Sequence, residues 1–287
     1  MNQACFSLTN PQKSIWYTED FLSGTNIGNI CGTLIFKEPV QFKKLEQAVN
    51  LLIQNNDNFR LHFTLENQVP KQYVEDYKYV RLKPFELFTQ KDLSDLEQRT
   101  VSTKFHLLHN NLYKFLFFKF SDNTGGFILN IHHLIADGWS FSILLNEIIS
   151  YYKALLEKEE VVFKSYSYLD YVKKETDYLQ SEQYQIDKDF WHTLYQEIPE
   201  TAMLPNIKHT NYQPFSYQAK RSTFHLPTDF VQAIRDLCTQ NHVSLFHFFM
   251  SVYSLYIHRV TGLEKFAIGT PILNRGNFIE RNTCGMF

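Results

Sequence analysis

The spacing of apolar residues predicts alternating helices and strands over the first half of the chain. An apolar residue at every third or fourth position is typical of a helix, whereas a short apolar run between turn residues is typical of a strand. The predicted helices cover Asn10–Phe21, Gln41–Gln54, Asp92–Phe105 and Trp139–Leu156. The predicted strands cover Ile30–Phe36, Phe59–Leu65, Lys71–Val74, Leu112–Phe120 and Gly126–Ile131. This alternation predicts an α/β fold.

The second half of the chain is predicted to be richer in helices. The predicted helices cover Tyr168–Ile198, Pro227–Asn241 and Ser244–Arg259, and the predicted strands cover Lys220–Leu226 and Phe266–Leu273. Ser244–Arg259 is apolar on nearly every face, which is typical of a buried helix. Glu157–Ser167 is charged and less periodic, so we expect it to join two subdomains, residues 1–165 and residues 166–287.

Composition and charge restrict the class of protein. The chain has 287 residues, of which 44% are hydrophobic and 20% charged, so we expect a globular protein with a sizeable core. The net charge is −2 and the 28 basic residues are spread along the chain, so neither nucleic acid nor an anionic membrane is an expected partner. The four cysteines are far apart and no apolar run is long enough to span a bilayer. We therefore expect reduced thiols, no signal peptide and a location in the cytoplasm.

The stretch from His132 to Ser140 carries the clearest candidate chemistry. His132 and His133 lie at the predicted end of a strand, and Asp137 and Gly138 follow just before a predicted helix. Consecutive strand residues face opposite sides, so only one imidazole can point into a given cavity. This argues against a shared metal ion and for one catalytic and one structural histidine. A histidine with a pKa near 6.5 can remove a proton from an amine, hydroxyl or thiol at neutral pH, and we predict that His133 does so.

The residues around His133 are expected to support it. A lone histidine is more often a hydrogen-bonded structural residue than a catalyst, but the following Asp-Gly pair favours catalysis. We expect Asp137 to hold the loop through an ion pair or hydrogen bonds, and Gly138 to allow a backbone conformation or close approach that a side chain would block. The helix that follows would offer free N–H groups to an oxyanion. No glycine-rich phosphate loop or metal-ligand spacing occurs, so no bound cofactor or metal is expected.

The stretch His132–Ser140 resembles the His-His-x-x-x-Asp-Gly motif of condensation domains of nonribosomal peptide synthetases, in the chloramphenicol acetyltransferase-like superfamily. Other segments are similar to further motifs of that family in the same order. They are Leu8–Trp16, Asn56–Phe63, Tyr168–Tyr171, and Gly269–Arg275 together with Gly285–Phe287. The second of these departs from the family, because Asn55, Asn56 and Asp57 stand where the family has Arg, His and Glu.

The resemblance implies a two-subdomain acetyltransferase-like sandwich of which this chain covers roughly two-thirds, so that the second subdomain is incomplete. It implies amide formation between a donor acyl thioester and the amine of an aminoacyl carrier protein. The substrates would be linked to 4′-phosphopantetheine or CoA, and the partners would be the carrier and adenylation domains of the same synthetase. His133 would be the catalytic or substrate-orienting residue and Gly138 would act through its backbone amide. Asp137 would belong to the catalytic group with His133 and Gly138, and would pair with Arg275. Structural and supporting roles are implied for the remaining motif residues: His132, Arg275, Arg60 and Trp139.

Within the family, the Asp-Gly-Trp-Ser sequence favours a condensation domain over an epimerisation domain, and the two histidines exclude the cyclisation variant. Gln12–Phe21 followed by Gly24–Asn29 looks most like the starter subclass, which joins a fatty acyl group to the first amino acid of a lipopeptide. The start at Met1 fits that position. Three alternatives stay open: a free-standing acyl-CoA-dependent acyltransferase, a catalytically silent module that recruits partners, and a structural fragment.

Overall fold

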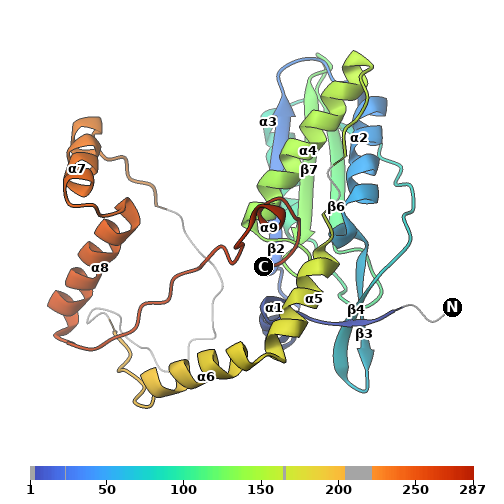
Figure 1. Ribbon diagram of the computed structural model, residues 1–287. Helices are drawn as coiled ribbons and strands as arrows, with labels where there is room; N and C mark the ends of the chain where they lie inside the picture. The colour runs from blue at the N-terminus through green and yellow to red at the C-terminus, as the bar shows by residue number, and fades with distance from the viewer. Residues whose placement is uncertain (1–3, 23, 164–165, 204–221) are drawn as a thin grey trace. The chain divides into compact units, whose positions relative to one another are not determined.

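The computed structural model describes residues 4–22, 24–163, 166–203 and 222–287 (Figure 1). The chain divides into two compact units, the first comprising Met1–Tyr184 with Ile272–Phe287 and the second comprising Gln185–Pro271. Ser165, where the predicted subdomain boundary lies, is outside the described residues, and that boundary stays a prediction. None of the helices within the described ranges combines the length and apolar character that a membrane-spanning helix needs.

The first unit contains two β-sheets. The larger has the strand order β2-β7-β6-β5, with the bounds β2 Asn29–Phe36, β5 Pro84–Glu86, β6 Tyr113–Lys119 and β7 Gly125–His132. Strand β7 pairs antiparallel with β2 and β6, while β5 and β6 are parallel. The smaller sheet has the order β1-β4-β3, with the bounds β1 Phe6–Ser7, β3 Leu61–Glu66 and β4 Val69–Val74. Strand β7 lies between β2 and β6, and all of its residues are buried.

Helices cover both faces of the large sheet. The helices of the first unit are α1 Asn10–Phe21, α2 Phe42–Asn55, the short η1 Asp57–Arg60, α3 Gln90–Val101, α4 Gly138–Glu157, α5 Tyr168–Leu179 and α9 Phe278–Arg281. Helices α2 and α4 pack together on one face, whereas α3 lies on the other (Figure 1). Side chains of β7 alternate between these layers, since Phe127 and Leu129 join the core under α2 and α4 while Ile128 packs with Leu93 of α3.

Most of the elements predicted for the first unit are confirmed, with changes in extent. The strand predicted from Phe59 begins at Leu61, since Phe59 and Arg60 belong to η1. Helix α3 ends at Val101 instead of continuing to Phe105. The predicted long helix Tyr168–Ile198 is two helices, α5 and α6 (Glu182–Leu194), because the chain turns at Gln180 and Ser181. The Ser181 hydroxyl accepts the Tyr184 N–H, which satisfies one of the free donors at the start of the new helix.

The second unit departs further from the predictions. It holds most of α6, together with α7 (Thr228–Gln240) and α8 (Leu245–Thr261). The predicted strand Phe266–Leu273, which runs from this unit into the first, is wrong, because all of its residues are described and none of them is in a strand. The predicted strand Lys220–Leu226 is also wrong where it is described, from residue 222 onward, while residues 220 and 221 lie outside the described residues.

The helix predicted to be buried over Ser244–Arg259 exists as α8, but it is largely exposed. Of its residues, all of which are described, only Ile257 is buried, and the side chains of Phe249, Leu255 and Tyr256 reach solvent. Within the described residues, its substantial helical contact is with α7. The apolar composition thus indicates a surface for packing, much of which is exposed among the described residues of this unit.

The pairing of β2 with β7 provides a stability test at Gly126. A Cβ atom at this position would lie 1.8 Å from the carbonyl oxygen of Leu34 on the neighbouring strand. We expect Gly126→Ala to lower the free energy of unfolding by about 3 kcal/mol or more, since the backbone of a central strand cannot move away cheaply. Gly269→Ala is the control, because nothing lies within 4 Å of its added Cβ. Equal denaturation midpoints for the two variants would contradict the pairing.

Candidate functional site

The turn between β7 and α4 places the two histidines in different surroundings. His132 ends β7 and is buried, with its ring edge-on to Phe105 at 5.9 Å between centroids. His133 is half-buried and its Nδ1 lies 3.3 Å from the Met286 sulfur. The two imidazoles thus contact different elements, as expected for consecutive residues at the end of a strand.

The backbone of this turn is anchored on both sides. The His132 N–H donates to the Leu112 carbonyl at 2.8 Å, and the His133 N–H donates to the Gly28 carbonyl at 2.7 Å. The Ile135 N–H donates back to the His132 carbonyl at 3.1 Å. These bonds fix the direction in which each histidine side chain leaves the turn.

The ring of His132 is fully used by internal contacts. The Leu134 N–H donates to His132 Nδ1 at 3.2 Å, so Nδ1 must carry a lone pair and the proton of the neutral ring lies on Nε2. His132 Nε2 is 3.4 Å from Glu19 Oε1. Both ring nitrogens therefore have partners inside the protein, which supports the predicted structural role.

His133 is suited to act as a base at neutral pH. Burial lowers the pKa of His133 below its usual value of 6.5, because the charged form loses hydration. The backbone groups of His133 and Ala136 and the charge of Asp137 oppose this shift, but burial is the larger effect. The imidazole is therefore predominantly neutral at pH 7 and able to accept a proton.

Asp137 and Arg275 form the ion pair that the sequence analysis predicted. Arg275 Nη2 lies 3.0 Å from Asp137 Oδ1 and 2.9 Å from Oδ2, and the Arg275 side chain is completely buried. Asp137 is also the N-cap of α4, since its Oδ1 accepts the Ser140 N–H at 2.7 Å. Both residues belong to the first compact unit, because residues 272–287 return to it.

Ser140 and Gly285 complete this network, although the sequence analysis gave neither a role. The Ser140 hydroxyl donates to the Gly285 carbonyl at 2.8 Å and accepts the Gly285 N–H at 3.0 Å. The Asp137 N–H also donates to the Gly285 carbonyl, at 3.1 Å. A Cβ at Gly285 would lie 2.0 Å from the ring of Tyr168, so this position requires glycine. Ser140 and Gly285 each lie in a motif segment of the sequence, but their contact joins distant positions and is visible only in the fold.

Gly138 differs from its expected structural role. Its φ is not in the left-handed region, and a Cβ added to it would meet nothing within 4 Å. The expected need for an unusual backbone conformation is therefore wrong. Among the described atoms nothing approaches Gly138 closely, so an approach by substrate is the remaining reason for a glycine here and stays a prediction.

The two other supporting residues have separate positions. Trp139, in the first turn of α4, donates its indole N–H to the Arg281 carbonyl at 2.8 Å and so ties α9 to α4. Arg60 ends η1 and donates to the Glu75 carbonyl at 3.1 Å. Its Nε is buried and has no hydrogen-bond partner among the described residues. The hydrogen bonds of Arg60 thus go to the chain after β4 and not to the histidine turn.

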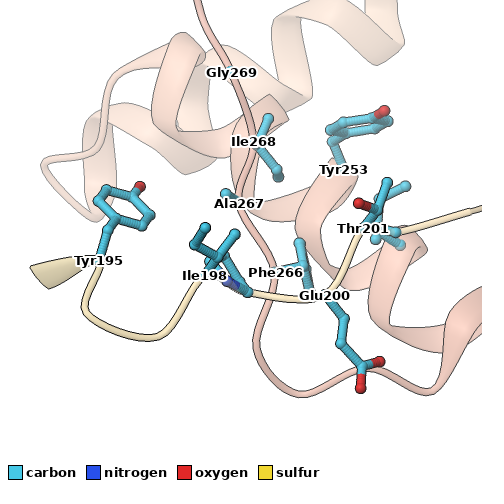
Figure 2. A pocket seen from close by; sticks show the side chains of 12 residues that line it. Tyr195, Ile198, Glu200, Thr201, Tyr253, Phe266, Ala267, Ile268 and Gly269 are labelled. Atoms are coloured by element: carbon cyan, nitrogen blue, oxygen red, sulfur yellow. The ribbon is translucent and has the colours of Figure 1, made fainter.

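The second unit has an open cavity of its own. It has a volume of about 470 Å³ and lies between the chain after α6, helix α8 and the segment 266–269. Figure 2 shows the rings of Tyr195 and Tyr253 and the side chain of Ile268 around it. None of its lining residues belongs to the histidine turn.

The geometry of the turn can be set beside known proteins. The family model described as Condensation domain matches residues 2–287. The chain is 32% identical over 290 residues to surfactin synthase subunit 1 of Bacillus subtilis (strain 168), covering 98% of this chain and 8% of that protein. It is 30% identical over 292 residues to a plipastatin synthase protein of the same organism, covering 100% of this chain and 11% of that protein. The chain thus spans about a tenth of the length of these relatives.

Solved structures confirm the predicted α/β fold class. The condensation domain of the Monacolin K polyketide synthase MokA superposes with a TM-score of 0.85 at 17% identity, over 99% of this chain and 66% of that one. A variant of the starter condensation domain of the rhizomide synthetase RzmA, in complex with C8-CoA, gives a TM-score of 0.82 at 20% identity, over 99% of this chain and 64% of that one. At these identities the likeness concerns the fold.

The contact between Asp137 and Arg275 predicts strong energetic coupling. Removing one partner leaves the other charge buried and unpaired, so Asp137→Ala and Arg275→Ala should each cost about 3–5 kcal/mol of unfolding free energy. The double variant should lose less than the sum, which a double-mutant cycle from chemical denaturation measures.

The exposed pair Lys153–Glu157, at 4.0 Å, is the control and should show coupling of about 0.5 kcal/mol or less. Additive losses for Asp137 and Arg275 would contradict the contact.

Proposed function

This chain belongs to the condensation domain family, and from that membership we propose that it forms an amide bond between a donor acyl thioester and the amine of an aminoacyl thioester on a carrier protein. The observation that carries the proposal is the environment of His133. Its imidazole is half-buried and uncharged at pH 7, and it stands on a turn anchored through Gly28, Asp137 and Arg275.

In the proposed reaction the acceptor amine attacks the carbonyl carbon of the donor thioester. A C–N bond forms, the C–S bond breaks, and the thiol of the donor arm leaves. His133 takes or orients the proton that the amine loses, and that proton ends on the leaving sulfur. The N-terminal turn of α4 supports the oxyanion through the backbone amides of Gly138 and Trp139, since the Ser140 N–H is already bound to Asp137.

The partners follow from the same proposal. The chain itself needs no bound cofactor, because the reactive groups arrive on 4′-phosphopantetheine or CoA thioesters. Carrier domains would deliver them, and an adenylation domain of the same synthetase would load the amino acid.

For the donor we propose a fatty acyl group, as in the starter subclass. Two observations support this choice. Gln12–Phe21 and the following Gly24–Asn29 resemble starter sequences, and a starter domain of similar fold is described as a complex with C8-CoA. The second observation also favours a runner-up, a free-standing acyltransferase that uses acyl-CoA directly. A small free amine as acceptor would identify the runner-up, and an aminoacyl carrier protein the main proposal.

The role of His133 is tested in a version extended to the length of the solved condensation domains. His133→Ala should lower the rate of amide formation roughly 10²–10⁴-fold with little change in melting temperature, because a positioned base contributes that much. His132→Ala should chiefly lower the melting temperature. Product formation is followed by mass spectrometry with a loaded carrier protein.

His106→Ala serves as the control for these two variants, because His106 is an exposed histidine outside the turn. If His132→Ala abolished turnover while His133→Ala only destabilised the protein, the assignment of the two histidines would be reversed. If none of the variants changed product formation, the silent recruitment module would be favoured.

The donor is tested by competition in the same extended version. Burial of each CH₂ contributes about 0.8 kcal/mol, so the efficiency of acyl donors should rise with chain length from C4 toward C14 until the channel is filled. An aminoacyl carrier donor should compete poorly. Preference for that aminoacyl donor, with no effect of acyl length, would identify an elongation domain and refute the starter assignment.

A further inference from the structure

Glu19 on α1 contacts the histidine turn, and although it lies in the segment Gln12–Phe21 it has been given no role of its own above. Its side chain is only 12% exposed. The single oxygen Oε1 accepts the Gly28 N–H at 2.9 Å and lies 3.4 Å from Nε2 of His132. Since Nε2 carries the proton of His132, both groups donate to this one carboxylate oxygen.

Gly28 connects this carboxylate to His133. Its N–H donates to Glu19, and its carbonyl oxygen accepts the His133 N–H at 2.7 Å. There is no spare room in the arrangement, because a Cβ at Gly28 would lie 2.4 Å from Glu19 Oε1 and 2.6 Å from His132 Nε2. Glu19 therefore fixes the turn at two points, the ring of His132 and the peptide that holds the His133 backbone.

An apolar residue at position 19 would leave two buried donors without a partner, the Gly28 N–H and the His132 Nε2–H. Buried donors without acceptors are costly, so the turn would open to water or shift. The hydrogen bond from His132 lowers the pKa of Glu19, which is consistent with an ionised acceptor at neutral pH. The oxygen has to reach both donors at once, so the length of the side chain is critical.

We propose that Glu19 is a positioning residue for His133, and that it acts through reach and hydrogen-bond acceptance rather than through charge. It holds the His132 ring and the Gly28 peptide so that the His133 side chain leaves the turn in one fixed direction. The catalytic use of this direction rests on the proposed function. The positioning of the His133 side chain by Glu19 does not.

A pair of substitutions separates reach from charge. Glu19→Gln keeps the length and offers a carbonyl oxygen to both donors, while Glu19→Asp keeps the charge but is one CH₂ shorter. Asp20→Asn is the control, since Asp20 lines the same cavity of about 510 Å³ beside α1 but has no part in the bonds to the turn. The first measurement is amide hydrogen exchange in the full chain at Gly28 and His133. We expect exchange about ten-fold faster at both sites in Glu19→Asp, and unchanged rates in Glu19→Gln and Asp20→Asn.

The second measurement is kcat and KM of amide formation in the extended version. Glu19→Asp should lower kcat about 10- to 100-fold with KM nearly unchanged, and Glu19→Gln should restore kcat. A result in which Asp is tolerated and Gln is not would overturn the proposal, because charge would then be the essential property. Unchanged exchange at Gly28 and His133 in Glu19→Asp would overturn it as well. If the wild type formed no amide, the proposed function would fail while the exchange data still decided the role of Glu19.

Discussion

The buried guanidinium of Arg275 is the constraint on which the architecture of the site depends. A charge removed from water needs acceptors, and the two terminal nitrogens of Arg275 find them in the Asp137 carboxylate, the Ser140 hydroxyl and the carbonyls of Glu280 and Thr283. The Nε of Arg275 is buried without a hydrogen-bond partner among the described residues. Its charged centre also lies 3.8 Å from the centre of the Phe287 ring. Satisfying one cation thus binds the C-terminal segment to the first turn of α4. A buried ion pair adds little net stability compared with apolar packing, so its main effect here is to specify a single geometry.

That geometry explains why the two adjacent histidines have different surroundings. The strand ends at His132, whose ring turns into the protein and is held by Glu19 and the Leu134 N–H. The next residue, His133, points the other way and meets Met286 from the segment that Arg275 anchors. The two sides of the turn are therefore braced by separate networks, one centred on Glu19 and the other on Arg275. Weakening either one would displace the His133 side chain without removing it.

The limits of prediction from this sequence are physical. Strand β7 and helix α4 could be predicted because the sequence of β7 contains a short apolar run and α4 repeats its apolar positions at helical spacing. The strand expected at Phe266–Leu273 was wrong, since an extended apolar run becomes a strand only beside a partner. Within the site, the Asp137–Arg275 contact followed from the family resemblance. Glu19 could not be found in this way, because one acid on an amphipathic helix resembles any solvated charge until Gly28 is folded against it.

In its proposed role as a base, His133 lies where burial weakens it. A buried imidazole has a lowered pKa, so it holds a proton less firmly, but it is also unprotonated at pH 7 and ready to accept one. For an amine that loses its proton only as the amide forms, a base that is neutral and held in place serves better than a stronger base that is already charged. Burial supplies the neutrality, and the two networks around the turn supply the placement. Desolvating His133 costs free energy. The contacts of the two networks offset that cost, and the rest of the unit already needs these contacts in order to fold.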